Sequence, residues 1–183
     1  ENGQKVEQID RTRPGSYHVI TVVRDDRGNS TTVDLTYLVT DPPTVVVKPE
    51  NPEEPGRELS PKEPPQGDDA TGTLHGQLED SYLRPTGSGT LGRPELADWL
   101  DGRYDWGDAQ LTLVEVKDKD GNAVGEIDLS QPDRYQVVAV VTDDMGNTTT
   151  VTVDYQLKEP PAVEVKPNQP GTGEDGTLRP DGP

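Results

Sequence analysis

The chain has 183 residues, a formal net charge of -18 and no cysteine, and 28% of its residues are hydrophobic. The acidic surface disfavours nucleic acids and anionic membrane surfaces, because both attract Lys and Arg. The missing cysteines exclude a disulfide framework, and no apolar run reaches the roughly 18 residues that a spanning helix needs. We therefore expect no nucleic-acid partner and no membrane insertion.

The chain contains an internal repeat. Residues 1–49, the first copy, align without a gap with residues 119–167, the second copy, and 23 of the 49 paired positions are identical. A fixed internal period is typical of an array of similar units. Residues 72–118 have no counterpart before residue 1, so we interpret 1–49 as the C-terminal part of a truncated repeat and 72–167 as a complete repeat. We expect a longer parent protein that is monomeric within a tandem array.

The first elements expected along the chain form a β-hairpin. Its second strand has apolar residues at every other position, which is typical of a strand with one buried face: Val33, Leu35, Tyr37 and Val39. The turn is Asp25-Asp26-Arg27-Gly28-Asn29, whose Asp, Gly and Asn are strong turn formers. Because 49 residues bury little core, we expect the first copy to fold poorly alone unless it borrows strands from a neighbour.

Two stretches are predicted to be extended linkers. Residues 50–71 are rich in Pro and acidic residues, and residues 168–183 have the same character. A Val-rich run precedes each linker, at residues 45–48 and 163–166. Each run is interpreted as an edge strand or as the first part of the linker, and the pattern does not decide between them.

The complete repeat is predicted to contain mostly strands. Residues 93–100 form a short helix candidate, with a Pro suited to the first turn. Residues 110–117 are expected to place Leu111 and Leu113 on one face, followed by a turn at 118–122 and a returning strand at 123–129. A central strand at 135–142 and an alternating strand at 150–157 complete the unit. Short strands with frequent turns favour an all-β sandwich.

The segment Pro132 to Val153 begins with the pattern Pro-x-x-Tyr-x-Val-x-x-x-Val-x-Asp-Asp-x-Gly-Asn-x-Thr-Thr-Val, and residues 14–35 begin with it in the first copy. This pattern resembles bacterial immunoglobulin-like repeats of Gram-positive cell-surface proteins. The resemblance implies immunoglobulin-like β-sandwich repeats with Pro-rich extended linkers. It also implies an extracellular location on the bacterial cell surface, with anchoring to the cell wall through regions outside residues 1–183.

An aromatic cluster is the candidate ligand site. Trp99, Tyr104 and Trp106 lie close together in a chain that is only 4% aromatic, and Asp105 lies among them. Flat aromatic side chains beside a carboxylate are typical of sugar-binding sites, so a host glycan is one candidate ligand. The alternative, which we favour, is that these rings fill a core that has no Phe.

Paired aspartates form the candidate metal site. Asp143 and Asp144 recur in the first copy as Asp25 and Asp26. Calcium is the cation that clustered carboxylates would bind. Turn chemistry explains the same residues, because Asp bonds its own backbone in tight turns. We favour the turn and expect no other cofactor.

The chain has no recognisable catalytic constellation, and we expect a non-enzyme. The predicted function is a repeat region of a cell-surface protein, acting as an adhesin module or as a stalk. The predicted partners are host glycan, mucin or extracellular-matrix protein, and several repeats would bind with increased avidity. The alternative is an accessory module, for carbohydrate binding or spacing, of a large secreted enzyme such as a glycosidase.

Overall fold

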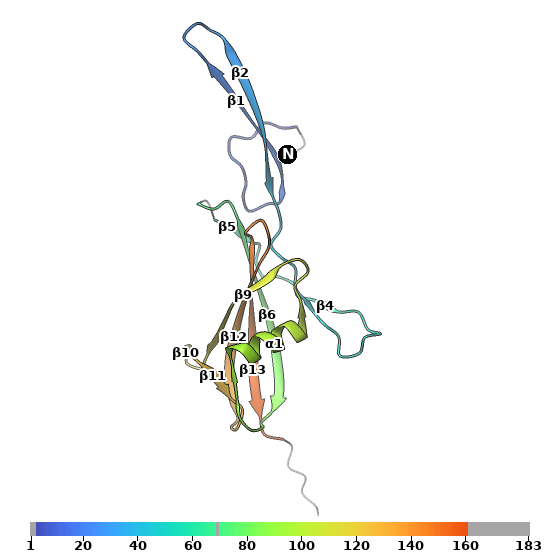
Figure 1. Ribbon diagram of the computed structural model, residues 1–183. Helices are drawn as coiled ribbons and strands as arrows, with labels where there is room; N and C mark the ends of the chain where they lie inside the picture. Colours follow the sequence, from blue (N-terminus) through green and yellow to red (C-terminus); the bar gives the residue numbers. More distant parts are fainter. Residues whose placement is uncertain (1–2, 69, 161–183) are drawn as a thin grey trace, which may run out of the picture.

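The structure is a computed structural model that describes residues 3–68 and 70–160. Strands make up 49% of the described residues and the helix 7%, which confirms the predicted all-β fold at the level of class. The molecule is elongated, with a long β-hairpin at one end and a larger sheet-containing body at the other (Figure 1). The predicted linker 168–183 and the Val-rich run 163–166 lie outside the described residues.

The hairpin is formed by β1 (Gly15–Arg24) and β2 (Ser30–Val39), which pair antiparallel from Gly15/Val39 to Arg24/Ser30. Gly28 has a φ of +88°, a conformation that favours glycine in the tight turn. The predicted strands and turn are confirmed. However, the alternating residues Val33 and Leu35 are exposed, because β1 and β2 pair only with each other.

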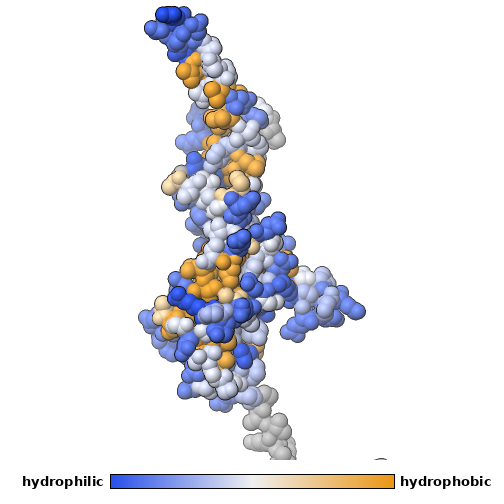
Figure 2. Space-filling model, in the orientation of Figure 1, coloured by the Kyte–Doolittle hydropathy of each residue, from blue (hydrophilic) through white to orange (hydrophobic). Residues whose placement is uncertain are grey.

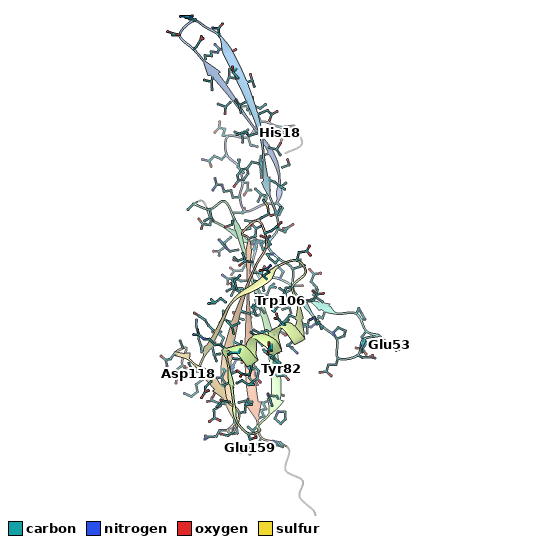
Figure 3. The ribbon with its side chains drawn as sticks, in the orientation of Figure 1. His18, Glu53, Tyr82, Trp106, Asp118 and Glu159 are labelled. Carbon is teal, nitrogen blue, oxygen red and sulfur yellow. The ribbon has the colours of Figure 1, made fainter. Side chains whose placement is uncertain are left out.

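Three short strands follow the hairpin: β3 (Val46–Val47), β4 (Arg57–Glu58) and β5 (Gln66–Gly67). β3 pairs antiparallel with β4 and also with β8 (Tyr104–Asp105), which belongs to the body. The Val-rich run at 45–48 therefore contains a strand, and this strand is added to the second repeat. The loop that carries Glu53 projects sideways from the body (Figure 3).

The main sheet of the body has the strand order β10-β9-β12-β13-β6-β5. Its long strands are β6 (Leu74–Pro85), β9 (Gln110–Lys117), β12 (Asp133–Thr142) and β13 (Thr148–Lys158), with β10 (Ala123–Val124) at one edge. β12 is central, as predicted from its Val on both faces. β13 pairs antiparallel with β12 and parallel with β6 along its whole length.

A helix and two short ribbons cover one face of this sheet. α1 (Arg93–Arg103) extends the predicted helix, with Pro94 in its first turn, and buries Leu96 and Leu100. The first ribbon is β7 (Thr90–Gly92) paired with β11 (Glu126–Asp128). The second ribbon has the strand order β4-β3-β8. Figure 1 shows α1 crossing in front of the sheet. Among the described residues, no helix has the length and apolar character needed to cross a membrane.

The core lies between the sheet and this covering layer. The predicted alternation in β13 is confirmed, because Val151, Val153, Tyr155 and Leu157 are all buried. They pack with α1 and with buried side chains of β9 and β12 such as Val116, Val137 and Val141.

The prediction that Leu111 and Leu113 share a face is wrong. Val140 lies opposite Leu113 and Val141 lies opposite Leu111, so Thr112 is an extra residue in β9. This β-bulge reverses the alternation, since one inserted residue moves all following side chains to the other face. Leu111 therefore packs on the core, while Leu113 is exposed.

Candidate functional site: the joint between the two repeat copies

The joint is the contact between the base of the hairpin and the upper end of the body. Its polar centre is the turn between β12 and β13, which has the sequence Asp-x-x-Gly-Asn. The same sequence closes β1–β2 and β9–β10, at residues 25–29 and 118–122. In all three turns the first Asp accepts the backbone N–H of the Asn four residues later, at 2.8 to 2.9 Å. The motif therefore builds the same turn three times.

Only the third of these turns extends across the joint. The Asn147 side chain is 3% exposed, and its Oδ1 accepts the backbone N–H of Leu74 at 2.8 Å. Its Nδ2 donates to the Thr40 hydroxyl at 2.6 Å and to Asp143 Oδ2 at 2.9 Å. One buried amide thus links the residue that follows β2, the start of β6 and its own turn.

Backbone contacts tighten the same region. The Thr149 hydroxyl donates to the carbonyl oxygen of Pro43 at 2.6 Å. A Cβ at Gly76 would lie 3.2 Å from Thr149 Oγ1 and 3.3 Å from Pro42 Cβ. Gly72 has a φ of +74°, and a Cβ there would collide with the Tyr37 hydroxyl. Glycine is required at residue 72 because both the backbone conformation and the close approach exclude a larger side chain.

A small apolar cluster supports the polar centre. Tyr17 and Val39 from the hairpin bury Leu74 from the body, with Ile9 and Tyr37 packed around them. Leu74 is fully buried, although it begins a strand at the end of the sheet. This cluster is separate from the main core, so the joint has its own hydrophobic contact.

Residues 44–59 clamp the first copy onto the body. Val45 and Leu59 are buried in the main core, and the Leu59 N–H donates to the Val45 carbonyl at 2.9 Å. The Lys48 N–H donates to the Arg103 carbonyl at 2.8 Å, and Lys48 Nζ donates to the Asp101 carbonyl at 2.7 Å. The end of the first copy and the predicted linker therefore both contribute to the core of the second repeat, through Val45 and Leu59.

An ion-pair network holds the clamp at its other end. The Asp80 carboxylate, on β6, accepts from Arg57 Nη2 at 2.7 Å, from Arg103 Nη2 at 2.8 Å and from the Tyr104 hydroxyl at 2.8 Å. Burial alone would raise the pKa of Asp80, but these hydrogen bonds outweigh it and place the pKa below its usual value. Burial also raises the pKa of the Tyr104 hydroxyl, which stays protonated and donates. The network ties β4, β6, α1 and β8 together.

The predicted ligand residues are brought together, but mostly inside the body. Tyr104 and Trp106 are buried, Trp99 is half-buried, and Asp105 is exposed. The rings of Trp99 and Tyr82 contact each other in a tilted arrangement, with centroids 5.0 Å apart, and the ring centroids of Tyr104 and Trp106 are also 5.0 Å apart. Figure 3 shows Tyr82 and Trp106 beside α1. Core packing accounts for this clustering, and glycan binding by these residues stays a prediction.

The predicted metal residues lie in the two hairpin turns. Asp25 and Asp143 use their carboxylates to accept turn N–H groups. Asp26 and Asp144 follow them at exposed positions. Within residues 3–68 and 70–160, no group of three or more His, Cys, Asp or Glu could hold a metal ion. Calcium binding therefore stays a prediction.

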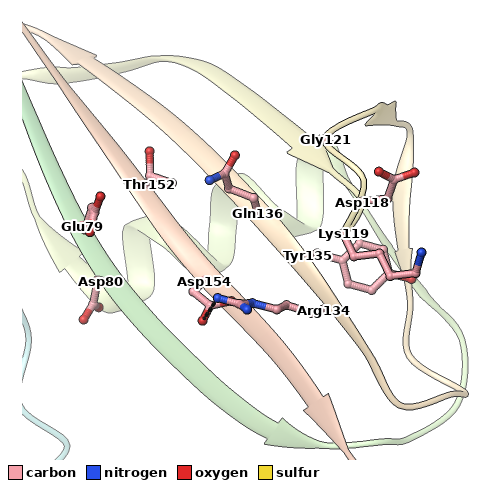
Figure 4. Close-up of a pocket in the computed structure, with 10 residues that line it drawn as sticks. All are labelled: Glu79, Asp80, Asp118, Lys119, Gly121, Arg134, Tyr135, Gln136, Thr152 and Asp154. Carbon is pink, nitrogen blue, oxygen red and sulfur yellow. Dashed lines mark hydrogen bonds and ion pairs between the residues drawn. The ribbon is translucent and has the colours of Figure 1, made fainter.

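A shallow depression of about 460 Å³ lies on the outer face of the sheet (Figure 4). Arg134 and Asp154 form a bidentate pair within it, at 2.5 and 2.9 Å, and α1 lies behind the sheet. The hydrogen bond from Arg134 is the main cause that lowers the pKa of Asp154. The carboxylate is therefore held in its charged form and is not suited to act as a general acid near neutral pH.

No protein-family model, curated protein or solved structure matches the chain. The joint and the clamp are the features that sequence reasoning missed. Two sequence features pointed to these contacts: Asn147, which the turn motif already explained, and the Val-rich run at 45–48. Neither feature indicates which residue lies opposite it across the joint.

Replacing Asn147 with Ala should destabilise the body by about 1–3 kcal/mol, because the Leu74 N–H is then buried without a partner. Urea unfolding followed by Trp fluorescence measures this loss. Asn29→Ala and Asn122→Ala are matched controls, because among the described residues these two side chains bond within their own turns and not across the joint. Equal losses in all three variants would show that the cross-joint bonds contribute nothing.

Replacing Val45 with Ala should also destabilise the body, by roughly 1–3 kcal/mol, because it removes buried methyl groups and leaves a cavity. The matched control is Val46→Ala at the next residue, whose side chain is half-buried and outside the main core. Chemical unfolding at a common temperature gives both values. A Val45→Ala variant as stable as the Val46→Ala control would contradict the clamp.

The Asp80 network predicts a dependence of stability on pH. Folding lowers the pKa of Asp80, so the ionised carboxylate stabilises the folded state. This stabilisation is fully present above the unfolded-state pKa of about 3.9, and it is lost as the pH falls towards the folded-state pKa. Asp80→Asn should therefore reduce stability at pH 7 and flatten the decline of stability below about pH 5. Urea midpoints measured from pH 3 to pH 7 test this; parallel curves for both proteins would refute it.

Proposed function

We propose that the chain is a load-bearing, non-catalytic stalk region of an extracellular bacterial surface protein. In this proposal the repeats are immunoglobulin-like, and residues 40–68 and 70–73 contribute to a structured joint between them. Regions outside residues 1–183 would anchor the protein to the cell wall. The stalk would hold a binding region away from the surface, and the joint is the observation that carries the proposal.

Two local features support the immunoglobulin-like assignment. The Tyr17 hydroxyl, near the start of β1, donates to the backbone carbonyl of Asp10 at 3.0 Å. Tyr135, its counterpart in β12, is buried and follows Asp128 at the same spacing as Tyr17 follows Asp10. A Tyr near the start of a late strand that bonds backbone a few residues upstream is the tyrosine corner of immunoglobulin-like domains. The covering layer is reduced to α1 and short ribbons, which differs from a full second sheet.

The pairing of β6 with β13 supports the load-bearing role. These strands run parallel and pair from Thr148/His75 to Lys158/Pro85. β6 begins at the joint, and β13 ends at the opposite end of the body (Figure 1). Tension between these two ends would slide one strand along the other and load all of their hydrogen bonds at once. A pull on both strands from the same end would break the bonds one after another.

The joint supports the same role because it removes a flexible connection between units. Its contacts include a buried amide, an apolar cluster and a clamp that shares the main core. Domains without a substantial shared interface are expected to move relative to one another. The acidic surface would keep neighbouring stalks apart. A glycan-binding role gains no support from rings that are already packed in the core.

Single-molecule force spectroscopy tests the proposal with two double-cysteine variants, because the chain has no cysteine of its own. Ala70→Cys with Glu159→Cys applies tension along the β6–β13 pair from opposite ends. Ala70→Cys with Met145→Cys pulls the same two strands apart from one end. All three positions are exposed, so the handles should not disturb the core.

We expect the unfolding force to be several-fold higher in the first geometry than in the second, since many hydrogen bonds must break together. Similar forces in the two geometries, or a lower force in the first, would contradict a load-bearing role. The second geometry serves as the matched control, because both variants unfold the same body.

A further inference from the structure

The hairpin β1–β2 exposes a large apolar surface. Ile20 is 64% exposed, and Leu35 is 58% exposed. Figure 2 shows apolar patches along the hairpin above the joint. The register of the hairpin divides its large exposed apolar residues between two faces: Val19, Val23, Val33 and Leu35 on one face, and Ile20, Val22 and Leu38 on the other. The face with Val19, Val23, Val33 and Leu35 corresponds to buried positions of the second copy, and apolar surface of this kind indicates an interaction site.

The second copy shows what covers the same positions in a complete repeat. Val33 corresponds to Val151 and Leu35 to Val153, and both of the latter are 0% exposed. In the body, β9 pairs with the free edge of β12 and β6 pairs with the free edge of β13. Leu96 and Leu100 of α1 pack on the face between them. All three covering elements come from one segment, residues 74–117.

The turn of the hairpin offers a matching polar contact. Asn29 is held by Asp25 as Asn147 is held by Asp143, with Nδ2 to Oδ2 distances of 2.7 and 2.9 Å. In the second copy, this geometry directs the Asn147 Oδ1 to the backbone N–H of Leu74. Asn29 therefore presents the same preformed acceptor to a segment that begins in the same way as β6.

We propose that β1–β2 is a docking surface for a strand–helix–strand segment with the sequence pattern of residues 72–118. The internal repeat fixes the register. The β6-like strand lies parallel to β2, with its His75 equivalent opposite Ser30 and its Pro85 equivalent opposite Thr40. The β9-like strand lies antiparallel to β1, with its Lys117 equivalent opposite His18 and its Gln110 equivalent opposite Arg24. These pairs are those of the body shifted by 118 residues.

The occupant is therefore a repeat segment rather than a second hairpin. Pairing two hairpins edge to edge would leave the apolar faces open, because neither hairpin brings a helix. The segment brings both missing edge strands and the apolar helix face together. This inference depends on the internal repeat and not on the load-bearing role. The docking proposal and the load-bearing proposal can therefore be refuted separately.

The test uses the full chain with an added copy of residues 72–118 placed directly before Glu1, which reproduces the spacing of the second repeat. Amide exchange by mass spectrometry reports on β1–β2, and binding of a hydrophobic dye reports on the exposed face. We expect exchange in β1–β2 to slow to the level of β12–β13 and dye binding to fall, while sedimentation shows a monomer. In the unextended chain, exchange in β1–β2 should be much faster.

The matched control carries Leu96→Asp and Leu100→Asp in the added copy alone. Its helix can no longer cover the hairpin, so β1–β2 should exchange as fast as in the unextended chain. Fast exchange in the extended chain without these substitutions would overturn the proposal. Protection of β1–β2 that requires dimerisation of the unextended chain would also overturn it, because the occupant would then be a second hairpin.

Discussion

The buried amide of Asn147 is the interaction on which the joint depends. It connects three segments that are far apart in the sequence: Thr40, Leu74 and its own turn at Asp143. A buried polar group is stable only when its hydrogen bonds are made. Among the described residues, every buried side-chain nitrogen and oxygen has a partner. Opening the joint would remove the Thr40 hydroxyl from the buried amide, so the hairpin base and the body are expected to move together.

Hydrophobic burial couples the two copies through a second route. Val45 and Leu59 precede the second repeat in sequence, yet they pack in its main core. The folding unit therefore begins upstream of the repeat unit. A core that borrows side chains from the preceding connection makes each unit depend on its neighbour, as in repeat proteins whose stability includes an interface term. The Asp80 network adds an electrostatic contact between the same connection and the body.

Local patterns predicted much of the fold. The sequence predicted the alternation in β13, the central position of β12, the helix α1 and the turns. These features could be predicted because they depend on neighbours in sequence. The same patterns failed where partners decide the outcome. Val33 and Val151 lie in almost identical sequences, but only Val151 has strands and a helix against it. The bulge at Thr112 was equally invisible, since it is defined only by pairing with Val140 and Val141.

The candidate site was harder to predict because its residues also have a local explanation. Asn147 satisfies the turn motif, and this motif gave no reason to look for a contact beyond it. The aromatic residues Trp99 and Trp106 drew attention by their rarity, although their rarity is explained by a core without Phe. A pattern that explains a residue locally conceals its long-range role.

The central claim is that the joint holds the hairpin base and the body as one unit. The most direct test of this claim is the distance between two spin labels, one at Thr36→Cys on β2 and one at Glu126→Cys on the body. Both positions are exposed and can therefore be labelled. A single narrow distance distribution in solution is the predicted result. A broad distribution, as two units on a flexible connection would give, would contradict it.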